Sequence, residues 1–557
     1  MIKNLICVAT LSASTSPTLP AWSPPEHISP AEGNWRTCYN FATALVADDE
    51  KNLHAVFFEE GGASAYWRRY NRFGRRWEAP YRLDESGGRD AAITVDATDQ
   101  LHVFFKAGNA LCHRGGDGMG NWGPREYLAV SGWHLGHPSP LPLPDGDVAL
   151  AMVGERTSGG PAYIWFTVWR HDGRGFEPPA RVSDTKGHYG SWMPTMAYFQ
   201  KKIRVVWRDD SSGECELYER TREGSSWTPT RRLTYDPAKT FHPRLAAEGG
   251  VLRLFFMDRR LGRPAIWEMV DAGGGWGPEH VLYDGGGIAY HPNVASAPDG
   301  RLLLFWEDNR ETPAEEVFYG TLFGKAWSAA ARVSQSPRTH SACPSAAVTN
   351  DGEIAVIYTE GQKDVCVQRL PLSEAPAGGV NFRARATPAG VKLSWDGENV
   401  DRFGRFNLYR ARLPGEDWWR LNADAIVGRP PFTYYDEPRS PGHYAYKLEG
   451  QTGTGQAMTC GAVRVTVGEG RPFIAGLSVS PNPCRESCSL AWRQEGPAAA
   501  TVAAYDIAGR RVAASGIEAA AGANTFELDA SRLAPGCYVA AVNAGGEESH
   551  TSFVVTR

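Results

Sequence analysis

The sequence has no C-x-x-C pair, no excess of positive charge and no long apolar run after its N-terminal leader. Its ten cysteines are scattered, so a zinc ribbon has no support, and the spacing of Cys484 and Cys488 alone does not establish a disulfide. Lysine and arginine number 58 against 63 acidic residues, a net charge of −5, so we expect no nucleic-acid partner. No later run reaches the ~18–20 apolar residues of a transmembrane helix.

Long helical patterns are also scarce, whereas the 557 residues include 19 tryptophans and 61 glycines. Aromatic residues interrupted by many turn residues favour an all-β protein. The leader has Lys3, a short apolar run at 5–11 and then small residues. This order is typical of a secretory signal peptide, predicted here as residues 1–20.

A tryptophan-led segment recurs along the first two thirds of the chain. Residues 22–29 read WSPPEHIS, and related segments begin at Trp77, Trp122, Phe176, Trp227, Trp276 and Trp327. These anchors are about 51 residues apart on average, a period that indicates β-propeller blades.

Each period contains four short segments with strand character, often opened by an X-Pro pair. Residues 22–29 are a fourth strand without a blade, and residues 340–372 are a blade without a fourth strand. Pairing the two closes the ring and leaves no open sheet edge. We therefore predict a seven-bladed propeller over residues 22–372, with the last blade closed by residues 22–29.

The turns before the anchors carry Asp and Gly, most clearly Asp271-Ala-Gly273-Gly-Gly-Trp276. They resemble degenerate Asp-box (BNR) repeats, the turns of sialidases and related propellers. The resemblance implies the propeller fold. Sialidase chemistry uses three arginines from separate blades and a Tyr–Glu pair; Arg208, Arg259 and Arg310 are available, but no Tyr–Glu pair can be assigned, and sialidases have six blades.

Acidic residues recur just after the second strand of five blades. Loops at this face of a propeller carry binding residues because a rigid ring holds them. One interpretation is a rim that binds a cation, sugar or carboxylate; the other is that each acid caps its own loop with an arginine beside it. The candidates are Glu60, Asp209, Asp258, Asp308 and Glu360, with Arg208, Arg259 and Arg310.

Three histidines, His137, His242 and His291, each precede a proline at the start of a first strand. The following proline is expected to hold each of them extended. Alternatively, equivalent imidazoles near one channel share a metal ion. We predict no cofactor and no metal ligands, with calcium as the alternative.

Two smaller domains are predicted after the ring. Residues 376–468 contain about seven short strands, among them VKLSW and FNLYR, and resemble a fibronectin type III β-sandwich in which Tyr444 or Tyr446 forms the tyrosine corner. Residues 473–557 resemble the type A C-terminal sorting domain of type IX secretion. The motif residues are Pro481, Asn482, Pro483, Asp506, Gly509, Arg510, Gly536 and Tyr538.

The sorting resemblance implies a secreted or outer-membrane surface protein with the type IX machinery as a partner. We expect a recognition protein whose loop face binds an extracellular glycan or protein, and no catalytic residues are assigned. The alternatives are a sialidase-like glycoside hydrolase or a lyase on the same propeller, and a structural surface component.

Overall fold

The computed structural model describes residues 22–556 with short gaps, and the predicted signal peptide lies outside the described residues. Residues 20–379 form one compact unit, and residues 380–557 belong to a second unit. The gaps are 38–42, 62–63, 85–87, 285, 325, 337–338, 377, 388–389, 398, 414–417, 439, 441, 453–456, 468–473, 495–496, 508–509 and 545–546.

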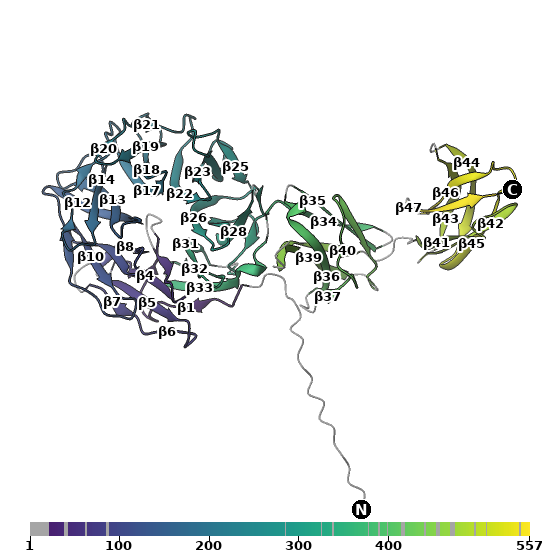
Figure 1. Cartoon of the computed structure of the whole chain (residues 1–557), viewed down its shortest axis with the longest axis horizontal. Helices are drawn as coiled ribbons and strands as arrows, with labels where there is room; N and C mark the ends of the chain where they lie inside the picture. The colour runs from purple at the N-terminus through teal and green to yellow at the C-terminus, as the bar shows by residue number, and fades with distance from the viewer. Residues whose placement is uncertain are drawn as a thin grey trace, which may run out of the picture. The chain divides into compact units, whose positions relative to one another are not determined.

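The described residues of the first unit form seven antiparallel sheets, numbered here in the chain order of their inner strands (Figure 1). Sheet 1 contains β2 (Trp35–Arg36), β3 (Leu45–Ala47), β4 (Leu53–Glu59), β5 (Ala65–Asn71), β6 (Arg76–Trp77) and β7 (Tyr81–Arg82). Sheet 2 contains β8 (Gly88–Val95), β9 (Leu101–Ala107), β10 (Ala110–Gly116) and β11 (Glu126–Leu128). Sheet 3 contains β12 (Trp133–Pro142), β13 (Val148–Arg156), β14 (Tyr163–Arg170), β15 (Gly175–Phe176) and β16 (Ala180–Arg181).

The remaining four sheets repeat this plan. Sheet 4 contains β17 (Ser191–Phe199), β18 (Lys202–Asp209), β19 (Glu216–Glu223), β20 (Ser226–Trp227) and β21 (Arg231–Arg232). Sheet 5 contains β22 (Thr240–Glu248), β23 (Val251–Asp258), β24 (Ala265–Asp271) and β25 (His280–Tyr283). Sheet 6 contains β26 (Ala289–Ser296), β27 (Leu302–Asp308), β28 (Glu316–Phe323), β29 (Ala326–Trp327) and β30 (Ala331–Arg332). Sheet 7 contains β31 (Ser341–Val348), β32 (Glu353–Glu360), β33 (Asp364–Pro371) and β1 (Glu26–His27).

The sheets are arranged as a β-propeller. The inner strands contact one another in the circular order β3, β8, β12, β17, β22, β26, β31 and back to β3, and Figure 1 shows the resulting ring. The second strand of each sheet is almost wholly buried between its neighbours, and every residue of β27 is buried. Continuous apolar runs in the sequence become second strands because both of their faces pack against adjacent sheets.

The N-terminal segment completes sheet 7. In β1, Glu26 lies opposite Val367 and His27 lies opposite Cys366 of β33. The ladder extends on both sides, with the Ser23 amide donating to the Arg369 carbonyl at 2.9 Å. Trp22 is buried and packs edge-on against aromatic side chains of sheet 6. The two ends of the propeller sequence are therefore joined by backbone hydrogen bonds and by core packing.

In the part of the chain that the structure describes, six inner strands contain a β-bulge near their start, where the register of pairing shifts. At each bulge one residue has a φ of 53–58°, in the left-handed region. The expectation that the three pre-proline histidines are extended is therefore wrong. A bulge inserts an extra residue that bends the strand and re-aims its side chain, and that geometry overrides the preference set by the proline. The six residues are Asp90, His137, Met193, His242, His291 and Cys343.

The described residues of the second unit form four sheets, two of three strands and two of four. The first pair is built from β34 (Asn381–Thr387), β35 (Gly390–Asp396), β36 (Phe403–Arg412), β37 (Trp419–Arg420), β38 (Phe432–Asp436), β39 (Gly442–Thr452) and β40 (Ala457–Val467). The second pair is built from β41 (Ile474–Ser480), β42 (Ser487–Gln494), β43 (Ala498–Asp506), β44 (Arg511–Ala519), β45 (Gly522–Asp529), β46 (Gly536–Ala544) and β47 (Glu547–Val555). The described helices are two 3₁₀ turns, η1 (Leu372–Glu374) and η2 (Val400–Arg402).

Tyr444 and Tyr446 have different partners in the first of these pairs of sheets. The Tyr444 hydroxyl donates to the Ser440 carbonyl, four residues upstream, at 2.5 Å, the contact that defines a tyrosine corner. The Tyr446 hydroxyl instead donates to the Asp436 carboxylate at 2.6 Å. Of the two candidates, Tyr444 makes the corner contact, while the fibronectin resemblance stays a prediction.

Candidate functional site

A pocket of about 410 Å³ opens where the inner strands of sheets 4 to 7 begin. The bulges place side chains at its wall, and the loops after the second strands complete it. The lining residues on strands are Arg36, Met193, Phe241, His242, Met257, Tyr290, His291, Glu307 and Ala342, and those on loops are Arg259, Glu315, His340 and Gln362.

His242 and His291 occupy equivalent bulges of adjacent sheets and meet in this pocket. Their rings pack edge to face with centroids 4.3 Å apart. Burial lowers the pKa of His242 well below its ordinary value, and the neighbouring His291, Arg208 and Arg259 lower it further. His242 therefore stays neutral at neutral pH, which keeps this part of the wall from accumulating charge.

Glu307 holds the second histidine in place. It is buried, and its Oε1 atom accepts hydrogen bonds from the His291 imidazole at Nδ1 and from the backbone N–H of Cys343. His291, Glu307 and Cys343 each offer one atom to a group whose atoms lie within 4.8 Å of one another. The same arrangement is a histidine oriented by a carboxylate, the pairing that fixes the tautomer of a general base.

Further polar groups surround this pair. Arg259 is exposed, and its Nη2 atom lies 3.4 Å from the Tyr290 hydroxyl. Arg36 forms an ion pair with Glu60 at 2.6 Å. His340 bonds through Nδ1 to Glu315 and forms a second histidine–carboxylate pair. The pocket therefore joins guanidinium groups, imidazoles and a phenol around one space.

The predicted rim residues are divided between this pocket and other sites. Arg259, His242 and His291 line the pocket, and Glu60 adjoins it through Arg36. Arg208 lies over the ring of Phe241. His137 lies elsewhere, with Nδ1 3.3 Å from Asp90 Oδ2 and its ring against Trp192. His137 is not among the residues that line the pocket, so of the three histidines only His242 and His291 share this space.

Asp209, Asp258 and Asp308 cap their own loops. Each accepts the backbone N–H of the residue two positions later, at 2.7, 2.7 and 2.8 Å. Arg310 folds back onto Asp308, and Arg260 onto Asp258. Of the two interpretations open for these repeated acids, loop capping is the one that the contacts match. Glu360 differs, because it contacts Ser336 and Cys366.

Sequence reasoning missed Arg36, Tyr290, Glu307, Glu315 and His340. One signal was available: an aromatic residue precedes the bulge residue in Trp192-Met-Pro, Phe241-His-Pro and Tyr290-His-Pro. This repeated triplet marks Phe241 and Tyr290 as neighbours of the channel. No comparable signal exists for Glu307, since it ends an apolar run and is followed at once by the loop-capping Asp308.

The comparison with known families is decisive for the C-terminal residues. Residues 478–556 match the family of secretion system C-terminal sorting domains. These residues form a secretion system C-terminal sorting domain. The sorting domain directs the protein to the cell surface or the extracellular space through type IX secretion. Within the described residues, no helix combines the length and apolar character needed to cross a membrane.

The motif residues of the sorting domain lie at strand ends. Asn482 is exposed, and its Oδ1 accepts the Val554 backbone N–H at 2.9 Å. Asp506 Oδ1 accepts the Arg510 N–H at 3.0 Å, and Gly509 lies outside the described residues. The Tyr538 hydroxyl, near the start of β46, donates to the Ala534 carbonyl at 2.7 Å. Pro481 and Pro483 flank Asn482, and Gly536 begins β46.

No curated protein is significantly similar to this chain in sequence. Among solved structures, an α-L-arabinanase from Penicillium chrysogenum is similar over 51% of this chain and 93% of its own, with 13% identity and a TM-score of 0.39. A family PL25 ulvan lyase is similar over 65% and 97%, with 12% identity and a TM-score of 0.45. Likeness at this level carries no conclusion about activity.

Proposed function

We propose that this secreted protein acts on an acidic glycan, whose carboxylate-bearing sugar binds in the pocket and is cleaved by β-elimination. One observation carries the proposal: Arg36, Arg259 and three imidazoles line a single pocket together with the Tyr290 hydroxyl. The three imidazoles belong to His242, His291 and His340.

Binding follows from the size and charge of the pocket. A volume of about 410 Å³ lies within the range of small-molecule sites. Arg259 and Arg36 supply planar donors that match a carboxylate. The rings of Phe241 and Tyr290 offer apolar faces for a sugar ring. Arg36 is already paired with Glu60, so the acidic sugar would supply an anion chiefly to Arg259, which a neutral sugar does not offer.

Elimination needs a cation at the carboxylate, a base for the adjacent C–H and an acid for the leaving oxygen. The C–H and C–O bonds break, a C=C bond forms, and the proton removed by the base is balanced by the proton that the leaving oxygen receives. In this proposal Arg259 binds the carboxylate. His291, oriented by Glu307, and Tyr290, beside Arg259, carry out the two proton transfers.

Hydrolysis by a pair of carboxylic acids fits less well. Glycosidases place one carboxyl group as acid and another as base or nucleophile at the scissile bond. The two pocket carboxylates, Glu307 and Glu315, are each bonded to a histidine. Each carboxylate therefore orients a histidine instead of facing a scissile bond as its acid or base. This favours a mechanism in which an imidazole and the Tyr290 phenol transfer the protons.

The test uses the full chain and a panel of uronic-acid polysaccharides, with arabinan and xylan as neutral controls. Ultraviolet absorbance reports the unsaturated product, and a reducing-end assay reports any cleavage. We expect both signals on an acidic polymer, with loss of the absorbance in Tyr290→Phe and Arg259→Gln. Arg231→Gln, an exposed arginine of β21, is the matched control.

Other outcomes separate the alternatives. Reducing ends without ultraviolet absorbance would establish hydrolysis and overturn elimination. Saturable binding without turnover would establish the recognition role that the sequence predicted. Neither binding nor cleavage of any acidic polymer would overturn the proposal.

A further inference from the structure

We propose that His27, Glu360 and Cys366 bind a Zn²⁺-class transition-metal ion that joins the N-terminal strand to the last sheet of the propeller. The inference is independent of the glycan proposal, because none of these residues lines the pocket. It differs from the sequence prediction, which assigned no metal ligands.

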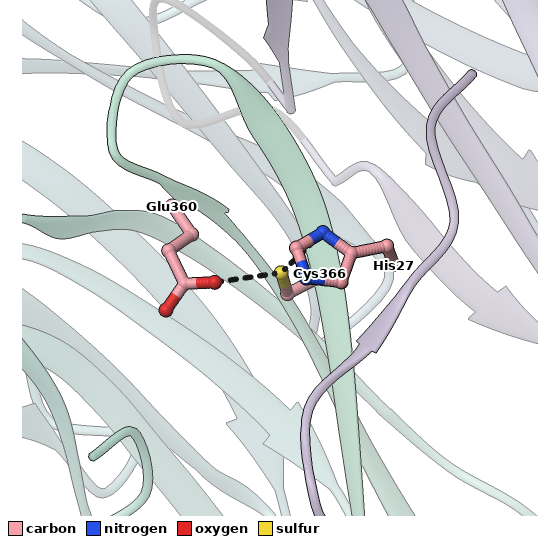
Figure 2. A group of neighbouring side chains, drawn as sticks. All are labelled: His27, Glu360 and Cys366. Carbon is pink, nitrogen blue, oxygen red and sulfur yellow. Dashed lines mark hydrogen bonds between the residues drawn. The ribbon is translucent and has the colours of Figure 1, made fainter. Parts of the chain in front are cut away.

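The ring closure brings the three residues together from three strands. His27 ends β1 and lies opposite Cys366 of β33 in the ladder, while Glu360 is the last residue of β32. Figure 2 shows the carboxylate on one side of the sulfur and the imidazole on the other. No two of them are close in sequence except Glu360 and Cys366, so the site exists only when β1 is docked.

The two separations from the sulfur are close to those around a bound ion. Cys366 Sγ lies 3.2 Å from Glu360 Oε2 and 3.6 Å from His27 Nδ1, and the three ligand atoms all lie within 4.8 Å of one another. In a tetrahedral zinc site with Zn–S near 2.3 Å and Zn–N or Zn–O near 2.0–2.1 Å, ligand atoms are about 3.3–3.6 Å apart. An ion therefore requires only small adjustments of side chains already in place.

The donor set selects the class of metal. One sulfur, one imidazole nitrogen and one carboxylate oxygen suit Zn²⁺ and its close relatives, whereas Ca²⁺ and Mg²⁺ prefer oxygen alone. Calcium, the alternative left by the sequence, does not fit this site.

The surroundings support coordination. The Ser336 hydroxyl donates to Glu360 Oε1, which leaves Oε2 facing the sulfur. Contacts of this kind orient a ligating carboxylate. Cys366 is buried, while His27 is exposed. An ion can enter from the solvent on the His27 side. With three protein ligands, the fourth position of a tetrahedral site is left for a water molecule.

A second group with suitable ligand types, His291, Glu307 and Cys343, does not carry the same inference. There one carboxylate oxygen already accepts from the His291 ring and from the Cys343 backbone N–H. That shared carboxylate oxygen is already engaged by two donors, and the group belongs to the pocket described above.

The ion would strengthen a short contact. β1 has two residues in its ladder with β33, so a metal bridge between them adds an attachment that does not depend on strand length. Because the site forms only in the closed ring, the free energy of metal binding adds to the stability of the closed state.

The experiment measures metal content and coordination in the full chain. The protein is stripped with a chelator, dialysed against Zn²⁺ or Co²⁺, and analysed by elemental mass spectrometry. We expect one ion per chain and, with Co²⁺, the visible and near-ultraviolet absorption of a thiolate-ligated tetrahedral site. Cys366→Ser and His27→Gln should each lose both signals.

Two controls keep the test decisive. Cys537→Ser removes an exposed thiol, and His280→Gln removes an exposed imidazole on β25; both variants should keep the ion. His27→Gln alters an exposed side chain, so its folding is secure if Cys366→Ser fails to fold. Wild-type protein that retains no ion after dialysis, or a His27→Gln variant that retains the thiolate spectrum, would overturn the proposal.

Discussion

The imidazoles of His242 and His291 contact each other edge to face, with ring centroids 4.3 Å apart. They occupy the same position in neighbouring sheets, and each has a left-handed backbone at a β-bulge. The repeat therefore supplies identical backbone geometry, and the residue chosen at each bulge decides what that part of the channel can do.

Stability is expected to fall in mild acid because buried histidines resist protonation. Burial is the main reason that the pKa of His113 falls to about 4, and the nearby His102 lowers it further. The unfolded chain binds this proton below about pH 6.5 but the folded chain does not, so stability is lost as the pH falls from about 6.5 to about 4. For His113 the loss is about 3 kcal/mol.

The measurement is the free energy of unfolding by urea at a series of pH values, for the wild type and His113→Gln. The free energy of unfolding of the variant should change less than that of the wild type between pH 6.5 and 4. Equal slopes would mean that His113 does not retain a low pKa in the folded protein. Absolute stability of the variant is not compared, because the substitution also changes packing against Trp169.

Trp22→Ala should destabilise the propeller by about 3–5 kcal/mol, the usual cost of removing a buried tryptophan. Trp22 packs against Phe305 and Tyr319 of sheet 6, so its loss leaves a cavity beside the ring closure. Thermal and urea unfolding measure the effect. Trp419→Ala, at an exposed site, is the control and should change little. A Trp22 variant as stable as the wild type would show that the segment before β1 contributes nothing to closure.

Asp271→Ala should cost about 2–3 kcal/mol without changing glycan binding. Its carboxylate accepts the N–H groups of Gly273 and Gly275 and pairs with Arg204, which lowers its pKa against the effect of burial. Asp172 occupies the corresponding exposed turn, and Asp172→Ala is expected to have little effect. Denaturation midpoints measure the loss of stability, and a glycan-binding assay measures affinity. A loss of affinity in Asp271→Ala would show that this turn binds the glycan.

Glu307→Gln should lower turnover about 10²–10⁴-fold if His291 transfers a proton, because the amide no longer stabilises a charged imidazole. KM should change less than kcat, and the acidic limb of the pH–rate profile should shift. Glu311→Gln, at an exposed loop position, is the matched control. A rise in KM with kcat unchanged would instead assign Glu307 to substrate binding.

Local pattern was sufficient for the periodic parts of the fold. Apolar runs such as LLLFW marked the second strands, and the segment WSPPEHIS indicated a strand that belongs to a distant sheet; β1 does pair with β33. Strand periodicity and turn residues are short-range properties, so the residues themselves express them.

The pocket could not be derived in the same way. Proline after His242 and His291 suggested an extended backbone, but the bulge imposes the opposite φ and directs both rings to one place. Glu307 sits in an apolar strand and became visible only through its bonds to His291 and Cys343. The contacts of His242 with His291 and of Glu307 with Cys343 join different sheets, so they depend on how the sheets pack.

The sequence alone determined the all-β class, the repeat of about 51 residues and the C-terminal sorting domain, because each is written in neighbouring residues. Only the tertiary structure decided which acids cap loops, which histidines meet and that His27 lies beside Cys366. The repeat pattern predicted which two segments close the ring, but the register that sets His27 opposite Cys366, more than three hundred positions away, depends on how the strands dock.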